Sequence, residues 1–424
     1  MLLLPPSLDE WLPEDHLARF ISEIVEDLDI SEILADYEKD LRGYPPYHPL
    51  MMLKILIYGY ATGVRSSRKI AKKCVEDVAF RYLAANNFPK FRAIADFRLR
   101  HLESFKKLFL QVLLLCKEAG LANLGHVALD GTRIKANASK HKAMSYGRMK
   151  AEEERLAKEI EAMIAQAQSV DEREDELYGQ DKAGDEMPEE LRRKEDRLKR
   201  IRAAKAALEA RAAQEKKNKD KGDDGPPKPD DRDQYNFTDP ESRIMPNPAD
   251  KKSFIQGYNA QVAVNENQVI VATRLTNEVS DCRQLPHMMA EIRANNDDLP
   301  DDLTADAGYF SYGNVLLLRE ILKVNALIPP DKERHGKRSG PVKGPPGKEA
   351  GLAEKMRRLL ATEIGKSTYA LRKALVEPVI GQIKTCQNFD RFLLRGQEKA
   401  SGEWNLACLC HNLRKLFQFR MNQV

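Results

Sequence analysis

A long tract of charged and small residues runs from about residue 145 to 220. It limits the possible folds of this chain more than any other part of the sequence. The tract is rich in Ala, Glu, Lys and Arg, and the apolar residues in its two halves recur at helical spacings. These apolar residues are Leu156, Ile160 and Met163, then Leu198, Ile201 and Leu208. Because Gly179, Gly184 and Pro188 lie between the halves, we expect two helices that fold back on each other as a hairpin.

Strand signals lie on both sides of this tract. Before it, GHVALDGTRIKANAS (125–139) contains a short β-rich run that ends on an acid followed by Gly, with a second extended stretch after it. After it, QGYNAQVAVNENQVIVATRLT (256–276) reads as a β-hairpin around Asn265, Glu266 and Asn267. Helix and strand signals then alternate along the rest of the chain. Without the tract, the order is strand, strand, strand, helix, strand, helix, strand, helix, which is the order of a ribonuclease-H-like fold.

We therefore predict a mixed α/β fold, with a ribonuclease-H-like domain whose mixed sheet is flanked by helices. Residues up to about 120 alternate helical periodicity with Pro, Asn and Gly breaks, so an all-helical N-terminal domain should precede it. A chain of 424 residues is long enough for several compact units. The predicted segments are 1–120 for the helical domain, 121–144 for the first part of the sheet domain, 145–235 for the hairpin and a polar linker, and 236–424 for the remainder.

Three acids would converge in such a fold. Asp130 belongs to the first strand, Asp306 to the fourth strand beside it, and Glu377 to a late helix packed across the sheet. Phosphodiester cleavage is served by two cations that stabilise the attacking and leaving oxygens, and carboxylates are the ligands that Mg²⁺ prefers. We expect two Mg²⁺ ions here, with Mn²⁺ as the alternative. Taken singly, however, an acid before Gly is often a turn-former, and most helical glutamates are solvated surface groups.

Four segments in this order give the chain a resemblance to a known family. They are LDGTRIKANAS, IQGYNAQVAV, TADAGYFS and YALRKALVEPVIGQIK, and they follow a helical N-terminal domain. In this the chain resembles the DDE transposases of bacterial insertion sequences. The resemblance implies that Asp130, Asp306 and Glu377 are the catalytic, metal-binding acids. It also implies an enzyme that binds the terminal inverted repeats of its element, cleaves DNA and joins the 3′-hydroxyl ends to target DNA.

The last segment carries the family's Tyr, Arg, Glu and Lys signature on one helix. By resemblance, Tyr369, Arg372 and Lys384 are DNA-binding residues around Glu377. Lys384 follows Glu377 by seven positions, two turns along the same helix face, where it would reach a DNA phosphate. Arg372 precedes Glu377 by five positions whereas the family spacing is four, which Lys373 occupies, so either basic residue fits the role.

A dense basic set lies in the N-terminal helices. RSSRKIAKK, with Arg65, Arg68 and Lys69, is followed by two short helices that end FRAIADFRLRH, a rhythm typical of a helix-turn-helix. We expect these residues to bind the ends of the element, although a charge run is also the usual make-up of a solvated face. A second basic run, from Lys332 to Lys348, fits either a loop that follows the DNA backbone or a tolerated surface insertion.

Three features of the sequence allow more than one interpretation. Gln256, Asn259 and Gln261 either buttress the acids, contact DNA or simply belong to an alternating strand. The 145–220 hairpin serves assembly or DNA contact, or packs against the sheet domain. The run of Cys408, Cys410 and His411 has no second ligand pair at zinc-like spacing, and so favours a buried helix face.

Composition and patterning bear on location and partners. The net charge of only +4 does not indicate whether the protein binds nucleic acid, because large acidic and basic totals nearly cancel. No export signal and no apolar run of membrane-spanning length is visible, so we expect a cytoplasmic, nucleoid-associated protein with sparse free thiols and no membrane partner. Its partners would be element-end DNA, target DNA and a second copy in a homodimer or larger assembly. The alternatives are a ribonuclease-H-like nuclease without strand transfer, and a non-catalytic DNA-binding protein derived from a transposase.

Overall fold

The structure is a computed structural model that describes residues 7–38, 47–178, 189–217, 228–247, 250, 252–331 and 350–423. It divides into two compact units, one formed by Met1–Asn137 with Met245–Val424 and the other by Ala138–Ile244. The turn expected around Gly184 and the basic run 332–348 lie outside the described residues. The four-segment division made from the sequence stays a prediction.

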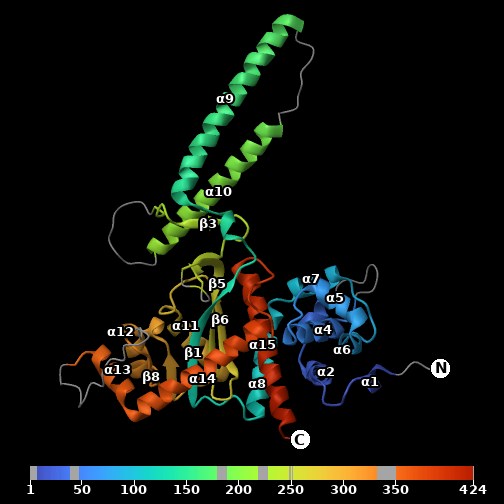
Figure 1. Ribbon diagram of the computed structural model, residues 1–424, viewed down its shortest axis with the longest axis vertical. Coiled ribbons are helices and arrows are strands. Elements are labelled where there is room, and N and C mark those ends of the chain that lie inside the picture. Colours follow the sequence, from blue (N-terminus) through green and yellow to red (C-terminus); the bar gives the residue numbers. More distant parts are fainter. Residues whose placement is uncertain are drawn as a thin grey trace. The chain divides into compact units, whose positions relative to one another are not determined.

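Eight helices precede the sheet in the described part of the first unit (Figure 1). They are α1 (Leu8–Trp11), α2 (Leu17–Asp27), α3 (Ser31–Glu38), α4 (Pro49–Ala61), α5 (Ser67–Glu76), α6 (Val78–Leu83), α7 (Phe91–Arg100) and α8 (Ser104–Glu118). α4 begins where the His48 side chain accepts a hydrogen bond from the Leu50 N–H and Pro49 takes the first helical position. Every residue of α4 except Leu50 is buried, as expected of a helix that is apolar all round. It packs against α2, α6 and α15 (Gln397–Met421), and so forms the centre of the helical region.

The sheet contains the five strands predicted from the sequence and one more, at Arg243–Pro246, that was not predicted. Its strands are β1 (His126–Lys135), β4 (Arg243–Pro246), β5 (Phe254–Asn265), β6 (Ile270–Thr276), β7 (Asp302–Ala305) and β8 (Asn325–Leu327). β5 pairs antiparallel with β1 and with β6, while β1 pairs parallel with β7 and β7 with β8. The order is β4-β5-β1-β7-β8, with β6 also paired to β5. Three antiparallel strands followed by two parallel ones give the mixed sheet of a ribonuclease-H-like fold, which confirms the predicted fold class.

The first strand is longer than expected. The sequence suggests a short run that ends at Asp130, whereas β1 continues through Gly131 to Lys135. The reason is that β1 has different partners on its two edges. On one edge β5 pairs along nearly all of it, up to the Lys135 and Gly257 pair. On the other edge β7 stops pairing at the Leu129 and Ala305 pair, so Asp130 lies where the parallel ladder ends.

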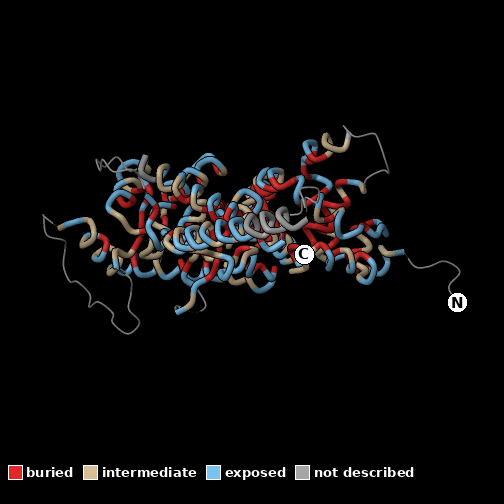
Figure 2. The backbone as a smooth tube through the Cα atoms, turned by 90° about the horizontal axis from the view of Figure 1, so that it is seen from above, coloured by how far each residue is buried: buried red, intermediate tan, exposed pale blue. Residues whose placement is uncertain are grey.

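Helices cover this sheet. They are α11 (Gln284–Asn296), α12 (Tyr312–Leu316), α13 (Leu352–Ala361), α14 (Glu363–Thr385) and α15, with single turns η2 (Ala307–Tyr309) and η3 (Leu317–Ile321). α11 and α15 pack against β6, and α14 packs against β1 and β5. β5 is buried at every position after Phe254, as a strand covered on both faces should be; buried residues are red in Figure 2.

α15 carries the Cys408, Cys410 and His411 run, and all three side chains are buried. The His411 Nε2 lies 2.9 Å from the carbonyl oxygen of Gln268. Complete burial lowers the pKa of His411 from 6.5 to about 4, despite the opposing effect of that carbonyl. The run is thus a buried helix face, and the imidazole is neutral at neutral pH.

We expect the free energy of unfolding to fall as the pH drops from about 6.5 towards 4. In that window the unfolded chain takes up a proton on His411 that the folded chain does not, so acid favours unfolding by up to ~3 kcal/mol through this group. Denaturant titrations at pH 7.5 and pH 4.5 measure this difference. His411→Gln should lessen the pH dependence, whereas His287→Gln, at an exposed site on α11, should leave it as in wild type. An identical pH dependence in His411→Gln and wild type would contradict the assignment.

The second unit contains the expected helical hairpin. Its elements are η1 (Lys140–Lys142), β2 (Ala143–Ser145), α9 (Tyr146–Tyr178), α10 (Glu189–Lys217) and β3 (Gln234–Asn236), with β2 and β3 paired antiparallel. α9 and α10 pack through one apolar core, which includes Leu156, Ile160, Leu198, Ile201 and Leu208 from the predicted stripes. Both predicted apolar runs therefore face each other. No helix in the described ranges is long and apolar enough to span a membrane.

Candidate active site

Two of the predicted acids stand side by side in the sheet. Asp130 follows Leu129 in β1, and Asp306 follows Ala305 at the end of β7, and those two preceding residues are partners in the parallel ladder. Neighbouring strands lie about 4.8 Å apart, so the acids occupy adjacent positions where that ladder ends. The Asp130 side chain is 19% exposed, which makes it accessible but largely enclosed.

Each carboxylate is oriented by the backbone N–H of a glycine. Asp130 Oδ1 accepts a hydrogen bond of 2.8 Å from Gly131, and Asp306 Oδ1 accepts one of 2.8 Å from Gly308. Burial raises the pKa of Asp130 to about 6; the Arg372 guanidinium opposes this shift and the nearby Asp306 adds to it. The two carboxylates therefore repel each other, and a cation between them would be stabilising.

α14 brings the third predicted acid and two basic residues to this edge of the sheet. Arg372 is buried, with its Nη1 2.9 Å from Asp130 Oδ2 and its Nη2 3.8 Å from Glu377 Oε1. Glu377 itself is 55% exposed. The neighbouring Lys373 is exposed on another face of the helix, so Arg372 is the basic residue that reaches the acids. The guanidinium of Arg372 also lies 6.0 Å from the centre of the Tyr369 ring.

Lys384 approaches the acids from the other side of Glu377. Its ammonium donates a hydrogen bond to Thr132 Oγ1, two residues beyond Asp130 in β1. Burial lowers the pKa of Lys384, while the charge of Asp130 works against that shift. Two cationic side chains thus lie near Asp130, a surrounding suited to an anionic substrate.

The basic residues predicted for DNA contact in the N-terminal helices separate into two kinds. Arg65 is only 7% exposed, and its Nε and Nη1 each donate a hydrogen bond of 2.9 Å, to the carbonyl oxygens of Asn388 and Arg391. Arg68 and Lys69 are exposed on α5, where Arg68 stacks 5.2 Å from the centre of the Phe91 ring. Only the latter two are free to face a ligand.

The structure adds a residue that the sequence analysis did not single out, Asp281, between β6 and α11. Its Oδ1 accepts hydrogen bonds from Asn259 Nδ2 at 2.7 Å and from Gln261 Nε2 at 2.9 Å. Asn259 and Gln261 have no exposed surface, which favours the buttressing interpretation of these two residues over DNA contact. Tyr309, whose hydroxyl donates to Gln261 Oε1, was likewise missed. Its position three residues after Asp306 is the sequence feature that could have identified it.

The donor chemistry of the site fits a divalent cation of the hard type. Asp130 and Asp306 offer carboxylate oxygens, while the Arg372 guanidinium lies between Asp130 and Glu377. Within the described ranges, no three side chains of the His, Cys, Asp or Glu type are arranged to enclose a metal ion. Asp130 and Asp306 occupy adjacent strand positions, and Glu377 is the more exposed acid, on α14.

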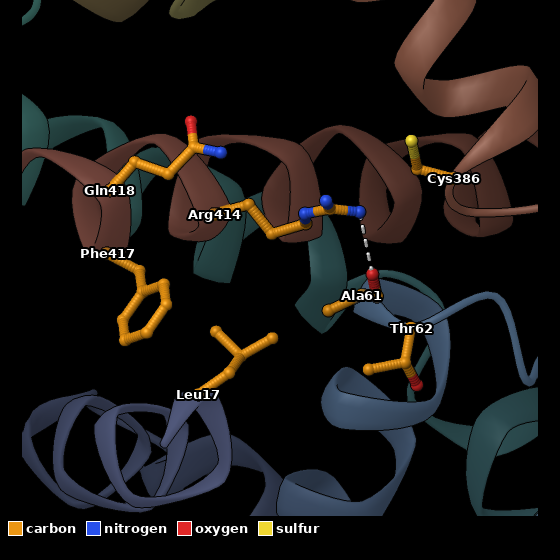
Figure 3. Close-up of a pocket in the computed structure, with 7 residues that line it drawn as sticks. All are labelled: Leu17, Ala61, Thr62, Cys386, Arg414, Phe417 and Gln418. Atoms are coloured by element: carbon orange, nitrogen blue, oxygen red, sulfur yellow. Dashed lines mark hydrogen bonds between the residues drawn. The ribbon is translucent and has the colours of Figure 1, made fainter. Parts of the chain in front are cut away.

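A cavity of about 340 Å³ lies elsewhere in the same unit, against α15 (Figure 3). Arg414 crosses it and donates a hydrogen bond of 3.1 Å to the carbonyl oxygen of Ala61. Its lining residues are Leu17, Ala61, Thr62, Cys386, Arg414, Phe417 and Gln418. Since none of them is a carboxylate, this cavity lacks the groups that phosphodiester cleavage requires.

Two family models match parts of this chain. A family model described as "Transposase domain (DUF772)" matches residues 6–100, and one described as "Transposase DDE domain" matches residues 229–413. Searches of curated proteins and of solved structures return no match. The two family models together span about two thirds of the chain, from the N-terminal helices to the strand with Asp306 and the helix with Glu377. The chain therefore belongs to the DDE transposases of the insertion-sequence type.

Proposed function

We propose that this transposase cleaves DNA at the ends of its element and joins the freed 3′-hydroxyl ends to target DNA, with Asp130, Asp306 and Glu377 as its catalytic acids. The observation that carries the proposal is the placement of Asp130 and Asp306 on neighbouring strands where the parallel ladder ends. Asp130, Asp306 and Glu377 would hold two Mg²⁺ or Mn²⁺ ions. When bound, such ions stabilise the negative charge on the attacking and leaving oxygens of a phosphodiester.

The chain's own cations have two roles in this proposal. Arg372 neutralises Asp130 across 2.9 Å when no metal ion is bound, which lowers the free energy of an otherwise repulsive acid pair. Lys384 and Tyr369 lie on the same helix as Glu377, where they would hold the DNA backbone beside the acids. Lys373 would contact DNA from the exposed face of that helix rather than at the acids.

A cleavage and joining assay with the full chain tests this function. The substrate is a DNA fragment that carries the inverted repeats flanking the coding segment, incubated with Mg²⁺ or with EDTA. We expect 3′-hydroxyl ends and strand-joined products with Mg²⁺ and neither with EDTA. Cleavage without joining would favour a nuclease of the same fold. Binding without cleavage would favour a DNA-binding protein derived from a transposase.

The N-terminal helices would supply part of the DNA contact. We infer that Arg68 and Lys69 of α5 face DNA phosphates, because both are exposed and belong to a helix-turn-helix rhythm. Each alanine substitution should weaken binding to element-end DNA and reduce the slope of log affinity against log salt by about one. Binding titrations at several salt concentrations measure both. Lys106→Ala, at an exposed lysine of α8 paired with Glu291, is the control and should bind as wild type. An unchanged salt slope in the Arg68 and Lys69 variants would remove α5 from the DNA interface.

A further inference from the structure

Asp281 makes contacts that link the two acid-bearing segments. Its side chain is 11% exposed, and Asn259 and Gln261 donate to its Oδ1. Arg133 Nη2 lies 3.1 Å from its Oδ2. Asn259 and Gln261 belong to β5, where they face Arg133 and Gly131 of β1 across the ladder. Both carboxylate oxygens are thus engaged by protein donors from two strands.

The same carboxylate lies close to two glycines. A methyl group on Gly131 would meet Gln261 Nε2 first and would lie 2.8 Å from Asp281 Oδ1. One on Gly308 would lie 2.9 Å from Asp306 Oδ1 and, at van der Waals distance, 3.5 Å from Asp281 Oδ2. These are the glycines whose N–H groups orient Asp130 and Asp306. Asp281 therefore packs against the backbone at both points where a catalytic acid is held.

Gln261 and Tyr309 extend this link towards Asp306. A carboxylate only accepts hydrogen bonds, so Asp281 fixes the Gln261 amide with its NH₂ group towards Asp281 and its carbonyl oxygen towards Tyr309. Tyr309 is fully buried in η2, directly after Asp306. Its hydroxyl donates to the Gln261 carbonyl oxygen, and its N–H donates to the Asp306 carbonyl oxygen at 3.1 Å, so the chain from Asp281 to the Asp306 turn is complete.

We propose that Asp281 is a positioning residue of the acid site, which sets the relation between Asp130 and Asp306 through Gly131, Gly308, Gln261 and Tyr309. This inference rests on the proposed function of the two acids. Asp281 does not act on the substrate itself, because its oxygens are engaged by Arg133, Asn259 and Gln261. An asparagine cannot replace it, since the amide would turn an NH₂ group towards one of these donors.

The test compares Asp281→Asn with wild type and with Glu278→Gln, a matched change at an exposed position of the same segment. The single-turnover rate of cleavage of end-bearing DNA should fall about 10–100-fold in Asp281→Asn, with the affinity for that DNA unchanged. In the absence of DNA, the affinity for Mn²⁺, measured by electron paramagnetic resonance, should weaken by about 10-fold. Glu278→Gln should match wild type in all three.

Tyr309→Phe removes only the hydrogen bond to Gln261 and tests the same link if Asp281→Asn does not fold. We expect a smaller loss of rate and Mn²⁺ affinity in the same direction. Wild-type rate and Mn²⁺ affinity per folded molecule, in Asp281→Asn or in Tyr309→Phe, would overturn the positioning role. So would a loss in Asp281→Asn as complete as that of Asp130→Asn, which would assign Asp281 to the reacting site itself. Unimpaired cleavage by Asp130→Asn would instead refute the proposed function.

Discussion

Asp130→Asn and Asp306→Asn are each expected to reduce cleavage of end-bearing DNA by at least ~10³-fold, about 4 kcal/mol of transition-state stabilisation. Each change removes one negative charge from the pair at the end of the β1 and β7 ladder and leaves its size nearly unaltered. The reason for so large an effect is that an amide oxygen binds a hard cation far less well than a carboxylate does. The single-turnover cleavage rate in Mg²⁺ is the measurement.

The matched control for these variants is Asp302→Asn, the same chemical change at the start of β7. It should cleave at the wild-type rate. All three variants should bind end-bearing DNA as wild type does, because the expected DNA contacts lie on α5 and α14. Substantial cleavage by either acid variant in folded form would show that the pair is structural.

Glu403→Ala is expected to lower the free energy of unfolding by about 3–5 kcal/mol. Glu403 has no exposed surface. Its Oε1 accepts from Tyr60 at 2.9 Å and from Arg65 at 3.3 Å, and its Oε2 accepts from the N–H groups of Leu393 and Leu394. Removal of the carboxylate leaves the buried Arg65 charge and the N–H groups of Leu393 and Leu394 without this acceptor. Denaturant unfolding followed by circular dichroism measures the loss.

Two further variants distinguish the effect of leaving a buried charge unpaired from the effect of shortening a side chain. Glu398→Ala, at an exposed position of α15, should cost less than ~1 kcal/mol. The double change Arg65→Met with Glu403→Met should be less destabilising than the sum of the two single changes, since no uncompensated charge stays buried. Additive losses would contradict the ion pair as the cause.

The position of this pair explains its importance. Tyr60 belongs to α4 and Arg65 to the connection between α4 and α5, while Glu403 lies in the buried part of α15. The loop that Arg65 holds also pairs with the end of β1, where the Phe392 N–H donates to the carbonyl oxygen of Lys135 at 2.8 Å. The helical region and the strand with Asp130 are thus joined through one buried charge.

The parts of the site that local sequence determines were predictable. The runs HVALDG and LTADAG each combine apolar strand residues with an acid and a small residue, and they place Asp130 and Asp306 in adjacent strands once the strand order is known. The helical hairpin was predictable for the same reason, because its two apolar stripes are periodic and pack on each other.

The parts of the site that depend on tertiary contacts could not be predicted from the sequence. Arg65 has the same local setting as Arg68 in RSSRKIAKK, but it is buried by a loop 323 residues further along the chain. The choice between Arg372 and Lys373 depends on which face of α14 turns to β1, and the signature spacing fits Lys373 better. Asp281 follows a strand without any local motif, and only its contacts with Asn259, Gln261 and Arg133 place it beside the acids.

The most direct test of the acid pair as a metal site is Mn²⁺ binding by the full chain on end-bearing DNA, measured by electron paramagnetic resonance. We predict about two ions per chain for wild type and for Asp302→Asn. We predict no tight binding when Asp130→Asn and Asp306→Asn are combined. Equal Mn²⁺ binding by this double variant and wild type would contradict a metal-dependent site at Asp130 and Asp306.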